Sequence, residues 1–201
     1  SSDLRRVSVS SLLRTQFEWF YPLSEQHQIQ FKIDAPKELY WNTDSVYFKK
    51  ILANLISNAF KYTEDGGTVR ISLHEEENFL VLKVYNTGKG IEEADMQNIF
   101  DRYRILGTMD NDDNRQNTTR NGLGLFICHS LVQSLGGKIN IESEVGQYAE
   151  FTVTLPFGIV EETSDNTIDE EIPVSLPSPN TDIQEPQISH TAQKETEEDR
   201  K

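Results

Sequence analysis

Cysteine is almost absent from this 201-residue sequence, in which Cys128 stands alone. One cysteine can form neither an internal disulfide nor a cysteine-based metal site, and it suits a reducing, cytoplasmic compartment. Long apolar runs are also missing. No stretch approaches the ~20 residues that a membrane span needs, and no signal peptide opens the sequence. We therefore expect no direct membrane contact from this chain.

Basic residues are in short supply, with 19 Lys and Arg against 33 Asp and Glu and a net charge of -14. Such an excess of negative charge is repelled by phosphate backbones and by anionic membrane surfaces. The composition therefore predicts no nucleic-acid partner.

The negative charge is concentrated at one end of the chain. Residues 157–201 hold 12 of the acidic and 3 of the basic residues, a net of -9, which leaves -5 for residues 1–156. We predict one folded domain over 1–156 and a disordered acidic linker over 157–201. The linker is either a dispensable tail or a tether to a following domain, and we favour the tether.

Apolar periodicity predicts the elements of the folded part. The expected helices cover 12–23 with Ser10 or Ser11 as N-cap, 44–62 capped by Asp44, a short segment after Ile91, and a segment from Gly122 to the pair Gly136 and Gly137. Alternating residues predict strands around 29–33, 69–73, 80–84, 139–141 and 149–155. The expected fold class is an α/β (α+β) two-layer sandwich, in which helices cover one face of a mostly antiparallel mixed sheet.

The first motif is residues 54–62, which read Asn-Leu-Ile-Ser-Asn-Ala-Phe-Lys-Tyr. At about 100° per residue, Asn54, Asn58 and Lys61 fall within an arc of about 60° on one helix face, at the border of the apolar stripe. They are either ordinary border residues or the lining of a polar site such as metal-bound phosphate. An amide oxygen is a suitable ligand for Mg²⁺.

The second motif is residues 86–91, Asn-Thr-Gly-Lys-Gly-Ile. Asn86 has the parity of the core residues of its strand, so its amide points toward the helices and needs a partner. Gly88 and Gly90 allow a tight turn and close backbone approach to a ligand.

The third motif is residues 121–125, Asn-Gly-Leu-Gly-Leu, at a predicted helix start, which favours an anion. The polar stretch before it, 101–120, is expected to be a mobile loop and contains four arginines: Arg102, Arg104, Arg115 and Arg120. These arginines either solvate the loop, as we expect for Arg115, or help the loop close over phosphates.

In this order and spacing, the motifs resemble the ATP-binding catalytic domain of sensor histidine kinases, a family related to the gyrase-type and MutL-type ATPases. The likeness covers about residues 7–156. It identifies 54–62 as the N box, 86–91 as the first glycine box, Ile99 and Phe100 as the phenylalanine box, and 122–125 as the second glycine box.

The resemblance implies a Bergerat-type fold that binds ATP and Mg²⁺ between the helices and the sheet, under a lid formed by about 101–121. It implies that Asn58 holds Mg²⁺, that Asn54 and Lys61 lie at the phosphates, and that Tyr62 packs near adenine. Either Arg102 or Arg104 would meet the γ-phosphate. The remaining nucleotide contacts would come from the other boxes and the lid: Asn86, Gly88, Gly90, Ile91, Phe100, Arg120, Gly122, Leu123, Gly124 and Leu125.

Two departures from the family's pattern bear on chemistry: Asn86 at the start of the first glycine box, and residues 101–104, Asp-Arg-Tyr-Arg, which do not match the commoner Phe-Tyr-Arg run. The first glycine box usually begins with Asp, which accepts a hydrogen bond from the adenine amine, and this chain has Asn86 instead. An amide can still accept this hydrogen bond, but without the negative charge the bond is weaker by about 1 kcal/mol. Because the amide can also rotate and present its NH₂ group, we expect weaker discrimination of ATP from GTP. The ATPases of the group have Glu as general base where this chain has Asn54. An amide cannot take a proton from water, so we expect poor hydrolysis.

We therefore predict a histidine kinase catalytic domain of a two-component system. It would transfer the γ-phosphoryl group to a histidine on a dimerisation and acceptor domain outside this chain, since His27, His74, His129 and His190 lack the acceptor's sequence context. The resemblance and the acidic tail suggest a hybrid sensor with a following response-regulator receiver domain, in a longer inner-membrane parent. The alternatives are a nucleotide-binding interaction module without catalysis and an anti-sigma-type serine kinase.

Overall fold

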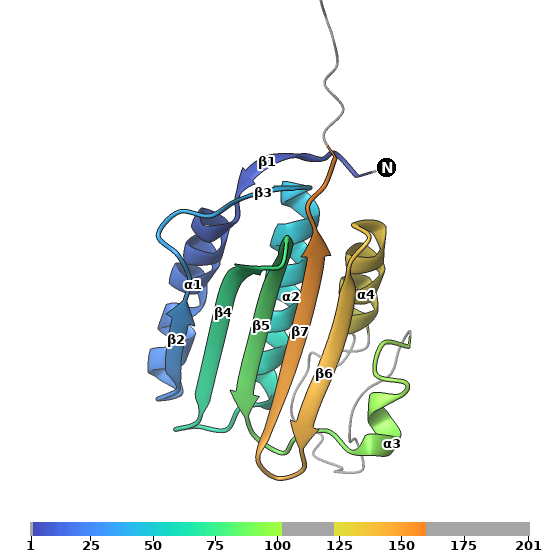
Figure 1. The fold of residues 1–201 in the computed structure, drawn as a ribbon. Coiled ribbons are helices and arrows are strands. Elements are labelled where there is room, and N and C mark those ends of the chain that lie inside the picture. The colour runs from blue at the N-terminus through green and yellow to red at the C-terminus, as the bar shows by residue number, and fades with distance from the viewer. Residues whose placement is uncertain (1, 102–122, 160–201) are drawn as a thin grey trace, which may run out of the picture. The chain divides into compact units, whose positions relative to one another are not determined.

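A five-stranded sheet with helices against one face forms the centre of the computed structural model, which describes residues 2–101 and 123–159 (Figure 1). In chain order the elements are β1 (Arg5–Ser8), α1 (Val9–Gln26), β2 (Gln30–Asp34), β3 (Tyr40–Thr43), α2 (Ser45–Tyr62), β4 (Thr68–Glu76), β5 (Phe79–Thr87), α3 (Glu93–Met96), α4 (Gly124–Ser134), β6 (Lys138–Glu144) and β7 (Tyr148–Pro156). In the described ranges, no helix combines the length and the apolar character of a membrane span.

The large sheet has the order β2-β4-β5-β7-β6, and only the β2–β4 pair of these strands is parallel. The β4–β5 hairpin turns at Glu77 and Asn78, which both have positive φ (48° and 66°). Two consecutive left-handed residues match the twist of the flanking strands. The predicted fold class, a mostly antiparallel sheet covered on one face, is confirmed.

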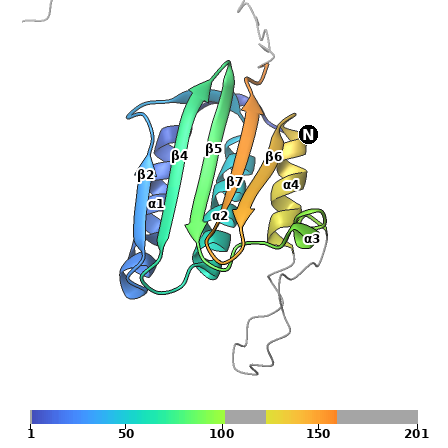
Figure 2. The same cartoon turned by 60° about the horizontal axis from the view of Figure 1, so that its bottom comes forward.

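The core lies between the sheet and the helices, and α1, α2 and α4 cover the same face in both views (Figures 1 and 2). Leu80, Leu82 and Val84 of β5 are buried as their alternation predicts, because successive strand residues point to opposite faces. The helix α2 lies over the middle of the sheet and buries its apolar stripe, which includes Ile51 and Leu55. This stripe fixes the rotation of α2 and therefore the direction of its polar edge.

The start of α1 differs from the prediction, because the N-cap is Ser8 and neither Ser10 nor Ser11. Ser8 makes no side-chain cap bond. The carbonyl of Leu39 accepts from the backbone N of Val9 at 3.0 Å, and the Ser10 hydroxyl is fully buried, where it accepts from the Leu39 backbone N at 3.0 Å. A distant backbone group thus satisfies the first helical N–H, so the helix begins without a local cap.

A second, two-stranded sheet, which the sequence did not predict, joins β1 to β3 in antiparallel register. Trp41 of β3 is buried and donates from Nε1 to the Pro156 carbonyl at 3.0 Å. Gly158 exchanges two hydrogen bonds with Asn42, at 2.9 and 3.1 Å. Packing on β3 therefore continues past the predicted boundary at residue 156, and the predicted linker from residue 160 onward lies outside the described part of the chain.

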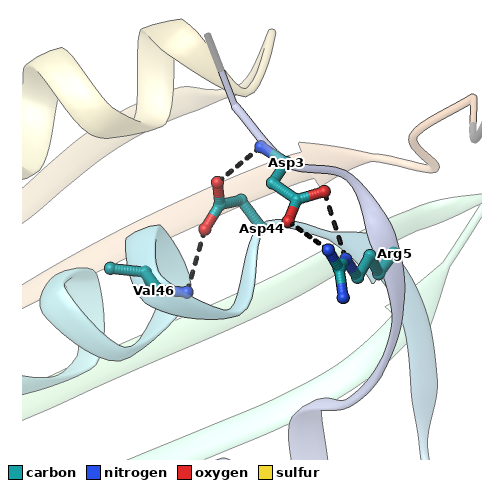
Figure 3. A network of polar contacts seen from close by, with 4 residues as sticks. All are labelled: Asp3, Arg5, Asp44 and Val46. Atoms are coloured by element: carbon teal, nitrogen blue, oxygen red, sulfur yellow. Dashed lines mark hydrogen bonds and ion pairs between the residues drawn. The ribbon is translucent and has the colours of Figure 1, made fainter.

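The residue after β3, Asp44, caps α2 as predicted and also ties it to the N-terminal segment (Figure 3). Its Oδ1 accepts from the backbone N of Val46 at 2.9 Å and of Tyr47 at 3.0 Å, and its Oδ2 accepts from the backbone N of Asp3 at 2.7 Å. Burial by itself would raise the pKa of Asp44, but these three N–H groups and the charge of Lys50 outweigh it and lower the pKa. The ion pair of Asp3 with Arg5 (2.8 Å) is exposed and contributes little.

Replacing Asp44 with Ala should lower the free energy of unfolding at neutral pH by about 1–2 kcal/mol, because the first turn of α2 loses its cap. Asp44→Asn should retain most of that stability. Since the folded-state pKa lies below its ordinary value of 3.8, the carboxylate stabilises the fold above that pH, and this contribution is lost as the pH falls through the folded-state value. Urea denaturation from pH 6 down to pH 3 should show a smaller acid loss for Asp44→Asn than for the wild type. Equal losses of stability at low pH in the two proteins would show that the Asp44 carboxylate does not stabilise the fold in this way.

Candidate functional site

A cavity of about 970 Å³ opens where α2 and β5 end. Figure 1 shows these two ends at the lower edge of the sheet. It is bounded by the C-terminal ends of α1 and α2, the segment after β5, and the inner face of β7. The lining residues are Phe20, Leu23, His27, Ser57, Asn58, Phe60, Lys61, Tyr62, Thr63, Glu64, Asp65, Asn86, Lys89, Gly90, Ile91, Glu92, Asp95, Ala149 and Phe151. The walls therefore combine apolar surface with amide, ammonium and carboxylate groups.

The edge of α2 contributes three neighbouring groups to this cavity: Asn58, Lys61 and Tyr62. Burial lowers the pKa of Lys61 and raises that of Tyr62, so each loses part of its hydration. The Lys61 Nζ lies 4.9 Å from the centre of the Tyr62 ring, and no carboxylate of the described residues pairs with it. Lys61 is exposed, and an ammonium that has no carboxylate partner among the described residues favours an anion in the cavity.

Asn86 reaches the cavity from β5, where it pairs with Val69 of β4 and Ala149 of β7. It is 4% exposed, and its Nδ2 donates to the Thr87 carbonyl at 3.1 Å. Its strand parity directs it toward the helix layer, as the sequence predicted. A polar residue at this buried position thus forms the floor of the cavity.

The two glycines of the first glycine box lie against the protein's own backbone. At Gly88 (φ 152°), a Cβ would stand well under 3.0 Å from the Tyr62 carbonyl oxygen, and at Gly90 (φ 66°) one would collide in the same way with the Glu144 carbonyl oxygen. Gly90 lines the main cavity, whereas Gly88 lines a neighbouring cavity of about 400 Å³. The sequence predicted that these glycines allow the backbone to approach a ligand closely. In the structure, they also allow it to approach the carbonyl groups of Tyr62 and Glu144.

The end of β6 and the turn that follows it support the first glycine box by hydrogen bonds. The sequence did not predict this support. The Ser143 hydroxyl accepts from the Ile91 backbone N at 2.8 Å and donates to the Tyr148 carbonyl at 2.6 Å. The Gly146 backbone N donates to the Lys89 carbonyl at 2.7 Å. Nothing in the sequence signals these bonds, because they depend on which strands lie side by side.

The first and third motifs meet at the start of α4. Gly124 begins the helix, and a Cβ there would lie 3.2 Å from the Asn54 Oδ1, so the glycine lets α4 approach the N box closely. Asn54 is half-buried at this contact and is not among the residues that line the main cavity. Leu123 occupies the N-cap position, and Leu125 packs against the core. Four predicted site residues lie outside the described part of the chain: Arg102, Arg104, Arg120 and Gly122.

The phenylalanine box packs beside α4. Ile99 is buried, and the Phe100 ring stacks on the His129 imidazole with centroids 4.9 Å apart and planes at 14°. This contact gives His129 a structural role. His27 pairs with Asp65 at 2.9 Å at the rim of the cavity.

The arrangement suits a ligand with an anionic part and a flat polar part. Asn58 and Lys61 can bind anionic or metal-bound oxygen, while Asn86 lies among apolar neighbours that can enclose a ring. Within residues 2–101 and 123–159, no group of three His, Cys, Asp or Glu side chains is arranged to hold a metal ion.

Residues 43–159 match the family described as "Histidine kinase-, DNA gyrase B-, and HSP90-like ATPase". The chain is 34% identical over 178 residues to the sensor protein EvgS of Escherichia coli O157:H7, covering 85% of the chain and 14% of EvgS. It is 32% identical over 163 residues to the adaptive-response sensory kinase SasA of Synechococcus sp. (strain JA-3-3Ab), covering 78% of the chain and 41% of SasA. The chain thus spans less than half of these relatives.

Solved structures with the same fold include histidine kinase catalytic domains. Full-length ShkA in complex with AMPPNP has a TM-score of 0.67 and 26% identity, over 79% of this chain and 32% of that one. The catalytic domain of histidine kinase ThkA has a TM-score of 0.67 and 24% identity, over 77% of this chain and 96% of that one. These likenesses agree with the architecture described above.

Proposed function

The chain belongs to the family of histidine kinase-, DNA gyrase B- and HSP90-like ATPases, as a catalytic domain of the histidine kinase type, and on that premise we propose that it binds ATP with Mg²⁺ and transfers the γ-phosphoryl group to a histidine of a separate acceptor domain. The observation that carries this proposal is the convergence of Asn58, Lys61 and Asn86 on one cavity.

The cavity fits the proposed ligands in size and in chemistry. Its volume of about 970 Å³ is at the upper end of the range for small-molecule sites, about 300–1,000 Å³. Asn58 offers a neutral oxygen of the kind that Mg²⁺ binds, and Lys61 offers a cation for phosphate oxygens. When bound, Mg²⁺ would neutralise charge on the phosphates. The ShkA relative was solved with AMPPNP, an ATP analogue, which supports this ligand class.

The transfer itself requires little covalent chemistry from this chain. The bond between the bridging oxygen and the γ-phosphorus breaks, a bond forms from that phosphorus to a neutral imidazole nitrogen of the acceptor, and ADP leaves with the electron pair of the bridging oxygen. The residues of the chain hold and orient the triphosphate. Asn54 cannot deprotonate water, so the phosphoryl group is kept for the histidine.

The acceptor histidine lies on another domain. Among the described residues, His27 pairs with Asp65, His74 lies 3.5 Å from a Glu76 oxygen, and His129 stacks on Phe100. Each of these contacts is structural, and His190 lies outside the described part of the chain. We propose a dimerisation and acceptor domain as the first partner and a response-regulator receiver as the second. The acidic residues after 159 would form the linker toward such a receiver.

The proposal is tested by mixing the chain with γ-labelled ATP and a cognate dimerisation and acceptor domain. Transfer should place acid-labile, base-stable label on the acceptor, as a phosphohistidine requires. Acid-stable label would indicate a serine kinase instead. Intact ATP binding without any label would indicate a nucleotide-responsive module.

Replacing Ser143 with Ala should weaken ATP binding about fivefold, because the Ile91 amide loses its acceptor and the first glycine box loosens. Ser143→Thr keeps the hydroxyl and should bind ATP within twofold of the wild type. Calorimetric titration measures both constants, and the Ala variant should also lose about 1 kcal/mol of stability, because Ser143 makes two hydrogen bonds. Wild-type affinity in the Ala variant would show that this bond does not position the box.

A further inference from the structure

We propose that the outer surface of α1 and α2 is a docking site for an acidic amphipathic helix of a partner protein. This surface, named here the α1–α2 face, consists of Trp19 and Leu23 from α1 and of Val46, Lys49 and Lys50 from α2. Apart from Leu23, these residues do not line the main cavity, so the inference goes beyond the proposed function.

The α1–α2 face exposes large apolar side chains. Trp19 is 79% exposed, Val46 54% and Leu23 37%. The other tryptophan of the chain, Trp41, is 2% exposed. Single apolar residues are ordinary on a surface, but an exposed tryptophan beside other exposed apolar residues is typical of a protein-binding site, where tryptophan often contributes most of the affinity.

The two helices that form the face contact each other and run in the same direction (Figures 1 and 2). α1 begins at Val9, whose backbone N donates to the Leu39 carbonyl just before β3, and α2 begins just after β3. The C-terminal ends of both helices line the main cavity. The Phe20 ring of α1 stacks on the Phe60 ring of α2 with centroids 5.6 Å apart and planes at 9°. This stack shows which sides of the helices meet.

On α1, helical geometry places the apolar residues of the face beside this stack. At 100° per residue, Leu23 lies about 60° from Phe20, and Trp19 lies about 40° further toward solvent. The two acidic residues of α1, Glu18 and Glu25, lie about 100° and 120° from Trp19 on its other side. The carboxylates of α1 therefore point away from the face.

On α2, the same geometry places cationic residues beside the stack. Lys49 lies about 20° from Phe60 around the helix, Val46 about 40° and Lys50 about 80°. Both lysines are exposed, and neither forms an ion pair within the described residues. The sequence of α2 contains no acidic residue. The face is therefore positively charged, although the chain has a net charge of -14.

The charge and the length of the face together define the partner. Lys49 lies eleven residues before Phe60 and Trp19 one residue before Phe20, so they are about ten residues apart along the helix axes, or about 15 Å. A partner helix of about three turns spans that distance, with apolar residues against Trp19 and carboxylates against the lysines. A second copy docked through the same face would bring lysines toward lysines. An anionic membrane would be repelled by the net negative charge of the chain.

The experiment uses the full chain and a designed helical peptide of about five turns, with leucines along one face and glutamates along the other. On binding, the fluorescence of Trp19 should shift to shorter wavelength, because Trp41 is already buried. Anisotropy of the labelled peptide measures its affinity. Trp19→Ala should weaken binding at least about tenfold. Lys49→Glu combined with Lys50→Glu should weaken it about tenfold and should strengthen binding of a peptide with lysines in place of the glutamates.

Lys138→Glu is the matched control, since Lys138 is exposed on β6, outside the α1–α2 face, and it should bind the acidic peptide within about twofold of the wild type. All variants should remain folded in thermal denaturation, because each changed side chain is exposed. They should also bind ATP as the wild type does, so failure of this interface and failure of the nucleotide site are distinguishable.

The proposal is overturned if the wild type does not bind the acidic peptide, if binding survives Trp19→Ala, or if the glutamate and lysine peptides bind equally well. A Trp19 emission shift with phosphatidylserine vesicles but not with the peptide would overturn it in favour of a membrane. Self-association of the wild type that Trp19→Ala abolishes, measured by sedimentation, would overturn it in favour of a second copy.

Discussion

Replacing Asn58 with Ala is expected to weaken Mg²⁺-dependent ATP binding by about 100-fold, because the cavity loses the amide oxygen proposed to hold the ion. Asn58 is half-buried on the edge of α2, one turn before Lys61 and Tyr62, and its neighbours Leu55 and Ala59 fix that edge by their burial. The measurement is calorimetric titration with ATP in the presence of Mg²⁺ and of EDTA. The wild type should lose affinity in EDTA, whereas the variant should bind equally weakly in both.

Lys49→Ala is the matched control, since Lys49 is exposed on the same helix and does not line the cavity. It should bind ATP as the wild type does. Both variants should unfold at the wild-type temperature within a few degrees, because neither removes a core side chain. If Asn58→Ala kept its Mg²⁺-dependent affinity, Asn58 would not be the metal ligand and the assignment of the N box would be wrong.

Replacing Gly88 with Ala is expected to lower the free energy of unfolding by about 3 kcal/mol, which combines backbone strain with a collision. A Cβ there would stand well under 3.0 Å from the Tyr62 carbonyl oxygen, so the first glycine box and the end of α2 would have to move apart. Both elements line the cavity, and ATP binding should be lost together with the stability. Urea denaturation followed by circular dichroism measures the loss.

Gly66→Ala separates the two causes. Gly66 also has positive φ (81°), but a Cβ there would meet nothing within 4 Å. Gly66→Ala should therefore lower the free energy of unfolding only by the backbone strain, about 1 kcal/mol. Similar losses for the two variants would show that the close approach to Tyr62 is unimportant.

The elements that the sequence predicted well are those whose signals are local. The bounds of α2 follow from the Asp44 cap and from the glycines at 66 and 67. The burial of Asn86 follows from strand parity. Neither prediction needs knowledge of a partner element, because capping, chain termination and alternation act over a few residues.

The features that the sequence did not predict depend on contacts between distant residues. Strand β1 pairs with β3 at positions such as Arg5 and Thr43, and each strand has four residues, too few for a clear alternation. The start of α1 depends on Leu39, and the support of the first glycine box depends on Ser143. These contacts exist because the sheet order brings the segments together, which periodicity alone does not determine.

The polar edge of α2 combines a feature that the sequence predicted with one that it did not. Helical geometry predicted one polar arc for Asn54, Asn58 and Lys61. In the structure, Asn58 and Lys61 line the cavity while Asn54 contacts the start of α4 at Gly124. The arc was derivable from the sequence, but the division of its residues between a cavity and a helix contact was not, because it depends on where α4 packs.

Isothermal titration calorimetry of the wild-type chain tests whether the cavity at the ends of α2 and β5 binds ATP with Mg²⁺. We expect saturable heat with one ATP per chain in the presence of Mg²⁺ and a much weaker signal in EDTA. An absence of binding heat in Mg²⁺, across a range of temperatures, would contradict it.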